Sequence, residues 1–156
     1  MNISKLAISI LICLGVGFLG SVFTTPSIDT WYAALNKPSF SPPNWMFAPV
    51  WTILFIMMGV SLYLVWDIRK KNTKKALYLF GVQLSLNLLW SLLFFGLRNP
   101  LLASAEIIIL WVVILLTIME FRKFSKTAAY LLIPYIIWVS FAAVLNFTIV
   151  FINYLL

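Results

Sequence analysis

The sequence contains no histidine, only four acidic residues and a single cysteine, Cys13, among 156 residues. Zinc and haem sites, and Ser-His or Cys-His nucleophile pairs, are built from clusters of these side chains. Such sites cannot be assembled here, so we predict no metal site, no resident cofactor and no conventional acid–base catalysis. One cysteine cannot form a disulfide within one chain, and Cys13 lies in an apolar run where a buried thiol is expected.

What the sequence has instead is apolar length. Hydrophobic residues make up 63% of the chain and charged residues 10%, whereas soluble domains are about half apolar and about one quarter charged. A helix needs about 20 apolar residues to cross the ~30 Å hydrocarbon core of a bilayer. Five runs are long enough or nearly so: 6–24, 49–66, 76–97, 101–119 and 129–155. We therefore predict an all-α membrane protein, with residues 1–156 forming one domain of five transmembrane helices.

The basic residues are divided unequally between the two sides of such a bundle. Lys37 and Arg98 fall on one side. The other nine fall on the side of the N-terminus: Lys5, Arg69, Lys70, Lys71, Lys74, Lys75, Arg122, Lys123 and Lys126. The positive-inside rule predicts a cytoplasmic N-terminus and an external C-terminus in a bacterial cell membrane. Because topology accounts for these clusters, we do not expect a nucleic-acid partner.

The first apolar run has alternative interpretations. Lys5 precedes it, as in a signal peptide, but the run from Leu6 to Phe23 is longer than the usual apolar core and no cleavage site follows, which favours a retained helix. Its letters "GVGFLG" match the G-x-G-x-x-G dinucleotide pattern, but the strand, the helix start and the acidic residue of that site are missing. We expect these glycines to allow a neighbouring helix to approach closely.

Residues 25–48, named the lid here, form a long connection on the external side. Connections of this length are usually functional or disordered, and the many aromatic residues argue against disorder. "DTWYAALNKP" predicts a short helix with Asp29 as its N-cap and Pro38 ending it, and "SFSPPN" predicts an extended segment. Pro49 suits the first turn of the next helix. We interpret the lid as a semi-rigid cap over an interior pocket.

Three predicted helices place aromatic and amide side chains on one face, at spacings of three, four or seven residues. Structural packing and interfacial positions explain most single residues of this kind. Asn87, however, lies near the middle of its span, where an unpaired amide is costly, so another helix or a ligand must satisfy it. The three faces are Gln83, Asn87, Trp90 and Phe94; Trp51, Phe55 and Met58; and Trp138, Ala142 and Asn146.

Three stretches carry a resemblance to a known family. "WYAALNKPSFSPPNWMFAPVWTILF", "QLSLNLLWSLLFF" and "PYIIWVSFAAVLN" resemble the tryptophan-rich sensory protein or translocator protein family (TspO/MBR, the peripheral benzodiazepine receptor family). The resemblance covers essentially the whole chain and suggests a bacterial member. It implies a dimer of five-helix chains that binds porphyrins such as protoporphyrin IX, and benzodiazepine or isoquinoline carboxamide drugs, in a pocket under the lid.

Carried over by position, the family's pocket comprises eight residues: Tyr32, Pro42, Trp51, Phe55, Asn87, Trp90, Trp138 and Ala142. The sterol motif of animal members ends in a tyrosine followed by a basic residue, whereas Tyr154 is followed only by Leu155 and Leu156, so we do not expect a sterol ligand. Lys37 and Arg98 are candidates for contacts with porphyrin propionates at the rim. A flat macrocycle needs apolar walls and aromatic faces rather than a metal ligand.

The leading hypothesis is a membrane receptor that senses, scavenges or carries porphyrins and related hydrophobic ligands. A second hypothesis is a light- and oxygen-dependent enzyme that degrades porphyrin, with Trp51 and Trp138 as electron or radical relays. A third is a small proton-coupled exporter, because Glu106 lies within a span and intramembrane carboxylates are often functional. Glu106 lies five residues beyond Leu101, so we expect it to reach the outer surface or to hydrogen-bond a neighbour. Trp66 and Trp111 are predicted at interfacial or lipid-facing positions.

Overall fold

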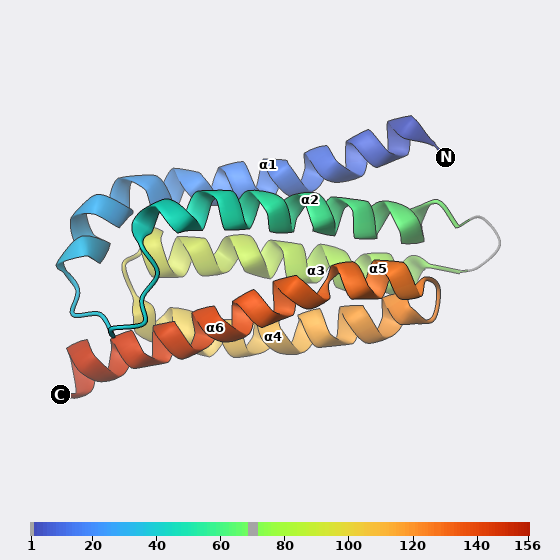
Figure 1. Cartoon of the computed structure of the whole chain (residues 1–156). Coiled ribbons are helices and arrows are strands. Elements are labelled where there is room, and N and C mark those ends of the chain that lie inside the picture. The colour runs from blue at the N-terminus through green and yellow to red at the C-terminus, as the bar shows by residue number, and fades with distance from the viewer. Residues whose placement is uncertain (1, 69–71) are drawn as a thin grey trace.

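The computed structural model describes residues 2–68 and 72–156, and these form an all-helical bundle (Figure 1). The α-helices are α1 (Ile3–Ser27), α2 (Phe47–Trp66), α3 (Lys74–Ser91), α4 (Pro100–Arg122), α5 (Lys126–Leu131) and α6 (Ile133–Val150). Shorter π or 3-10 segments adjoin them: η1 (Ile28–Tyr32), η2 (Asn44–Met46), η3 (Leu92–Gly96) and η4 (Phe151–Leu155).

Joined in this way, the described segments give five helices that are long and apolar enough to cross a membrane. They cover residues 3–32, 44–66, 74–96, 100–122 and 126–155. The predicted five-helix fold is confirmed. All five helices begin before the predicted runs, and the first and fourth also end after them, because polar and charged residues continue a helix beyond its apolar part.

The bundle has two distinct ends (Figure 1). The start of α1, the end of α2, the start of α3 and the α4–α5 turn lie at one end, which we name the inner end. The C-terminus, the lid and the α3–α4 connection lie at the other, the outer end. The described basic residues of the predicted clusters therefore gather at the inner end, while Arg69, Lys70 and Lys71 lie outside the described residues. Which end faces the cytoplasm stays a prediction.

The first helix is longer than the sequence suggested. α1 and η1 form one helical segment from Ile3 to Tyr32, so the prediction of a separate short helix capped by Asp29 is wrong. Pro26 lies inside α1 and removes one backbone donor. Transmembrane helices tolerate proline where hydroxyl groups and local π turns compensate. Here the π turn of η1 follows the proline. The Thr30 hydroxyl donates to the carbonyl oxygen of Pro26 at 2.8 Å, which is a different group from the Val22 carbonyl that loses its donor.

Only residues 35–43 of the lid lie outside the helices. The backbone N–H of Ser41 donates to the carbonyl oxygen of Pro38 at 3.1 Å, so a turn replaces the first part of the extended segment predicted from "SFSPPN". Pro43 keeps the predicted extended conformation, with φ −60° and ψ 145°. The lid is attached to the last helix by two reciprocal bonds. The N–H of Asn36 donates to Oδ1 of Asn153 at 3.0 Å, and Nδ2 of Asn153 donates to the carbonyl oxygen of Asn36 at 2.8 Å.

Two further prolines lie where helices begin. Pro49 is in the first turn of α2, as predicted, because its missing N–H costs no hydrogen bond there. Pro134 is the second residue of α6, and the chain breaks its helical course at Leu132 just before it. The run 129–155, predicted as one helix, is therefore interrupted, since proline cannot donate to the residue four positions earlier.

The inner halves of α1 and α2 touch through their backbones. A β-carbon at Gly59 would lie 2.6 Å from the Cα atom of Ile10, so only glycine fits. Among the "GVGFLG" glycines, a β-carbon at Gly17 would lie 2.6 Å from the Phe55 ring, and one at Gly20 would lie 3.3 Å from the Ser91 hydroxyl. The predicted close approach is confirmed at these two positions.

The predicted close approach of a neighbouring helix is wrong for Gly15, where a β-carbon would meet no described atom within 4 Å.

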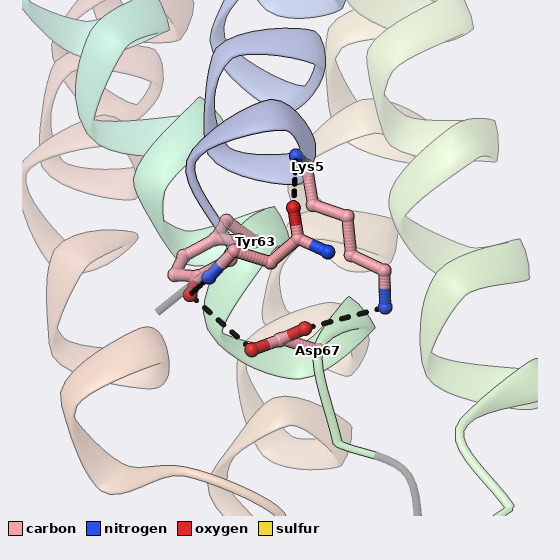
Figure 2. Close-up of polar contacts among 4 residues, drawn as sticks. Lys5, Tyr63 and Asp67 are labelled. Carbon is pink, nitrogen blue, oxygen red and sulfur yellow. Dashed lines mark hydrogen bonds and ion pairs between the residues drawn. The ribbon is translucent and has the colours of Figure 1, made fainter.

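A polar cluster joins the inner ends of the same two helices (Figure 2). We name its members, Asn2, Lys5, Tyr63 and Asp67, the inner clamp. The N–H of Asn2 donates to the Tyr63 hydroxyl at 3.1 Å, and that hydroxyl donates to Oδ2 of Asp67 at 3.2 Å. Nζ of Lys5 lies 3.2 Å from Oδ1 of Asp67 and 5.5 Å from the centre of the Trp66 ring. The clamp holds α1 against α2 at this end.

Candidate ligand-binding cavity

A cavity of about 480 Å³ opens in the outer half of the bundle, within the ~300–1,000 Å³ range of small-molecule sites. Segments from α1 to η3 and helix α6 line it. Ten of its 27 lining residues are aromatic: Phe18, Tyr32, Phe47, Trp51, Phe55, Trp90, Phe94, Phe95, Trp138 and Phe141.

The aromatic rings hold one another in place. The ring centres of Trp90 and Phe94 lie 4.9 Å apart in a stacked arrangement. Trp51 and Phe55 lie 5.5 Å apart in a tilted pair. Tyr32 is 1% exposed, and its ring centre lies 6.2 Å from that of Phe94 and 5.7 Å from that of Phe95. Rings fixed in this way form a rigid wall, which lowers the entropy lost when a ligand binds.

Two amides beside the cavity are satisfied by other helices. Nδ2 of Asn87 donates to the Tyr135 hydroxyl at 3.0 Å, so the partner that the sequence required is on α6. Asn146 accepts from Nε1 of Trp90 at 3.2 Å. Nδ2 of Asn146 donates to the Pro100 carbonyl oxygen and to the Ser104 hydroxyl, each at 2.9 Å. These bonds fix the rotamers of an amide and an indole that line the cavity.

The cavity reaches the surface sideways, between α1 and α2. Several side chains both line it and are exposed, and they form two facing stripes. One stripe on α1 and η1 has spacings of three or four residues; the other, on η2 and α2, has spacings of four. The first stripe is Phe18, Ser21, Thr25 and Asp29, and the second is Asn44, Ala48 and Thr52, of which Asn44 is half-buried. We name this opening the slot.

At its outer end the slot is bridged by a hydrogen bond from Nδ2 of Asn44 to Oδ1 of Asp29, at 3.2 Å. The hydroxyl groups of Ser21 and Thr52 donate to carbonyl oxygens of their own helices, at 2.6 and 2.8 Å. Because these donors are already used within the helices, the middle of the slot is compatible with contact to lipid.

The structure brings seven of the eight predicted pocket residues to this cavity: Tyr32, Trp51, Phe55, Asn87, Trp90, Trp138 and Ala142. Pro42, Lys37 and Arg98 are not among the lining residues. The Lys37 ammonium instead donates to the carbonyl oxygens of Tyr32, Ala33 and Leu35 at 2.9, 3.2 and 3.3 Å, which caps the end of the first helix. That these residues bind a ligand stays a prediction.

The lining residues of α1 were not predicted from the sequence. Leu14, Gly17, Phe18 and Ser21 lie in a run that was predicted only to span the membrane and to pack closely on another helix through its glycines. Its small and hydroxylated positions were the one available signal, because a purely lipid-facing helix does not need them. The helix has no amide or tryptophan before Trp31. The criterion used for the other helices, aromatic and amide side chains on one face, therefore identified no site residue in α1.

Two predictions outside the cavity need correction. Glu106 was expected to reach the surface or to hydrogen-bond a neighbour, but it is 6% exposed and its carboxyl oxygens have no hydrogen-bond partner in the described chain. It faces the packed interior of the bundle and does not line the cavity. Trp111 was expected at an interfacial or lipid-facing position, but its Nε1 donates to the Ser140 hydroxyl at 2.8 Å, because α4 packs against α6.

Trp66 lies at the inner end beneath Lys5, where an interfacial tryptophan is expected. Gln83 shares a face with Asn87 but lies below the cavity, with both amide atoms buried and without a hydrogen-bond partner among residues 2–68 and 72–156. Met58 is fully buried in the core rather than in the cavity wall.

Comparison with known proteins gives extensive similarity. A family model described as TspO/MBR family matches residues 9–152. A tryptophan-rich protein TspO of Archaeoglobus fulgidus is 48% identical over 153 residues, which is 98% of this chain and 99% of the relative. One of Chlorobaculum tepidum is 49% identical over 156 residues, or 97% and 98% of the two chains. The translocator protein of Homo sapiens is 38% identical over 133 residues, or 83% and 79%.

Proposed function

The chain belongs to the TspO/MBR family and is an integral multi-pass membrane protein, and from this premise we propose that it is a receptor for porphyrins and related flat hydrophobic ligands. Protoporphyrin IX is the ligand expected first, and benzodiazepine or isoquinoline carboxamide compounds are expected to share its site. The protein would sense, scavenge or carry these ligands without a resident cofactor.

The aromatic cavity is the observation that carries this proposal. Indole and phenyl rings from α2, α3 and α6 surround it, and each good ring contact contributes ~0.5–1.5 kcal/mol beyond area burial. The cavity has few polar groups and most are neutral, which suits hydrophobic ligands that dissolve in the membrane. The slot also allows a macrocycle that is larger than the enclosed volume to extend toward the lipid.

Substitution of the wall tryptophans tests the proposal. Trp51→Ala and Trp138→Ala each remove an aromatic face, so we expect the affinity for protoporphyrin IX to fall about five- to a hundredfold, or ~1–3 kcal/mol. Isothermal titration in detergent measures this without relying on tryptophan fluorescence. Trp66→Ala is the matched control, because this indole lies at the inner end beneath Lys5.

Equal losses in all three variants would indicate a folding effect, and the cavity would not be the site.

A second candidate function follows from the fact that Trp51 and Trp138 line one cavity. A bound porphyrin excited by light could pass its energy to oxygen, and the two indoles could act as radical relays during breakdown of the macrocycle. Illumination of the complex with and without oxygen tests this hypothesis. Loss of porphyrin absorbance at equal rates in both conditions would exclude it.

We also propose that the inner end faces the cytoplasm, because the described basic clusters gather there. In intact cells, a cysteine at exposed Ser39 of the lid should react with an impermeant thiol reagent. A cysteine at exposed Lys126 should not. The native thiol of Cys13 is buried and should contribute little background. The reverse labelling pattern would overturn this orientation. Dimerisation stays a prediction from the family likeness.

A further inference from the structure

Asp29 is the one lining residue of the cavity, among the residues that the structure describes, whose side chain carries a charge at neutral pH. It is exposed and stands at the outer end of the slot, on the same stripe as Phe18, Ser21 and Thr25. Every other described lining group is apolar, hydroxylated, an amide, a tyrosine or an indole. The mouth of the cavity therefore has one fixed negative charge.

No described cation forms an ion pair with this carboxylate. The Asp29 carboxylate accepts a hydrogen bond from the neutral amide of Asn44 at 3.2 Å, and the ion pairs of the described chain involve Lys5 with Asp67, and Lys75 and Lys123 with Glu120. The ammonium of Lys37, the described lysine of the lid, is directed at backbone carbonyl oxygens and at the Tyr32 ring. Asp29 thus differs from the acidic residues at the inner end, each of which has a lysine beside it.

A carboxylate in this place distinguishes ligands by their own charge. An anionic group held several ångströms from it is repelled, and the half-apolar surroundings screen that repulsion less than bulk water does. An ammonium group would be attracted, and an ester or amide would be almost unaffected. The repulsion weakens in high salt because the site is exposed.

We propose that Asp29 is a specificity-determining residue that disfavours ligands whose anionic groups project through the slot. This inference rests on the proposed function, since it concerns the ligands of the same cavity. A neutral or cationic ligand can place its polar end at the slot. A dicarboxylic porphyrin binds there at a cost, or turns its propionates away from Asp29 toward the outer surface.

Protoporphyrin IX and its neutral dimethyl ester test the inference as a pair, because the macrocycle is the same. The ratio of their dissociation constants is measured for the wild type and for Asp29→Asn, which keeps the side-chain shape and an acceptor for Asn44. We expect the variant to bind the diacid about two- to tenfold more tightly and the ester unchanged. In about 1 M salt the difference between the variants should shrink.

Glu120→Gln is the matched control, because it removes the same charge at the inner end, beside Lys75 and Lys123. It should leave both affinities unchanged. Asp29→Lys should improve diacid binding further. If the ratio of the diacid and ester dissociation constants is unchanged in both Asp29→Asn and Asp29→Lys, the inference is overturned and the proposed function is not. Failure of both porphyrins to bind the wild type would overturn the proposed function, and the inference with it.

Discussion

In the inner half of the α1–α2 pair the two backbones touch, whereas in the outer half the same helices stand apart around the cavity. Gly59 allows contact with Ile10 at one level, and the inner clamp fixes the ends below it (Figure 2). Farther out, exposed side chains such as Ser21 and Thr52 face the slot instead of each other's backbones. The change occurs near Gly17, which lies against the Phe55 ring.

The difference shows that one helix pair can stabilise the fold in one half and line a cavity in the other. A glycine packed on backbone permits close approach and many dispersion contacts. Gly17 instead packs on the Phe55 ring, and both residues line the cavity. Stability is therefore expected to depend mainly on the inner half, and ligand affinity on the outer half. The following substitutions test that division, from the largest expected effect to the smallest.

Gly59→Ala should have the largest effect. Its β-carbon would lie 2.6 Å from a backbone atom of Ile10, which cannot rotate away, and overpacking of this kind costs ~1–3 kcal/mol or more. We expect a clear fall in the melting temperature, measured by circular dichroism in detergent. Gly15→Ala is the control, since no described atom lies within 4 Å of that position. Equal stability of the two variants would show that the backbones are not in contact.

Gly17→Ala should act mainly on binding. The added carbon would meet the Phe55 ring at 2.6 Å, and the ring has the cavity to move into. We expect a smaller loss of stability than for Gly59→Ala, with an affinity for protoporphyrin IX about tenfold lower, or ~1.4 kcal/mol.

In a double-mutant cycle, Gly17→Ala should cost little stability once Phe55 is replaced by leucine. Additive losses would contradict this contact.

Replacement of Pro42 and Pro43 by glycine tests the lid at the outer end. Each change adds ~0.4–1 kcal/mol of conformational freedom to the unbound segment, so we expect ligand release to become several times faster while the helical content is retained. Stopped-flow displacement measures the release rate. An unchanged affinity and release rate, at an unchanged melting temperature, would mean that the lid only seals the helix ends.

Tyr63→Phe and Lys5→Gln in the inner clamp should have the smallest effects. The Lys5–Asp67 pair is partly exposed, at 27% and 31% of the two side chains, and such pairs contribute under ~1 kcal/mol. The lost hydroxyl of Tyr63 costs about 1 kcal/mol. Denaturation should detect these changes, while porphyrin affinity stays constant. A fall in affinity like that of Gly17→Ala would show that the two halves are coupled.

Much of the site could be predicted because the informative residues are rare in apolar helices. Trp51, Asn87 and Trp138 stand out in their runs, and the resemblance to a known family placed them together. The amide of Asn87 had to find a partner inside the bilayer, and it found Tyr135.

The contribution of α1 could not be predicted in this way. Its cavity positions include glycine, serine and threonine, and such residues also occur where two helices simply pack together, so they do not by themselves indicate a cavity. The extension of α1 past Pro26 was also unexpected, because a proline interrupts helices in water. Transmembrane helices tolerate such a proline where local π turns adjust the backbone, and the π turn of η1 follows Pro26 here. Asp29 was therefore assigned to a helix start instead of to the mouth of a cavity.

The sequence by itself determined the five spans, the unequal distribution of basic residues and the absence of disulfide and histidine chemistry. These depend on composition along the chain, because whether a segment spans the bilayer is decided by the hydropathy of that segment. The tertiary structure decided where α1 and α2 touch and where they separate, which side chains face the cavity and which charge stands at its mouth. Those properties depend on how each helix is rotated against its neighbours, and the hydropathy of a run does not encode that rotation because lipid and protein interior are similarly apolar.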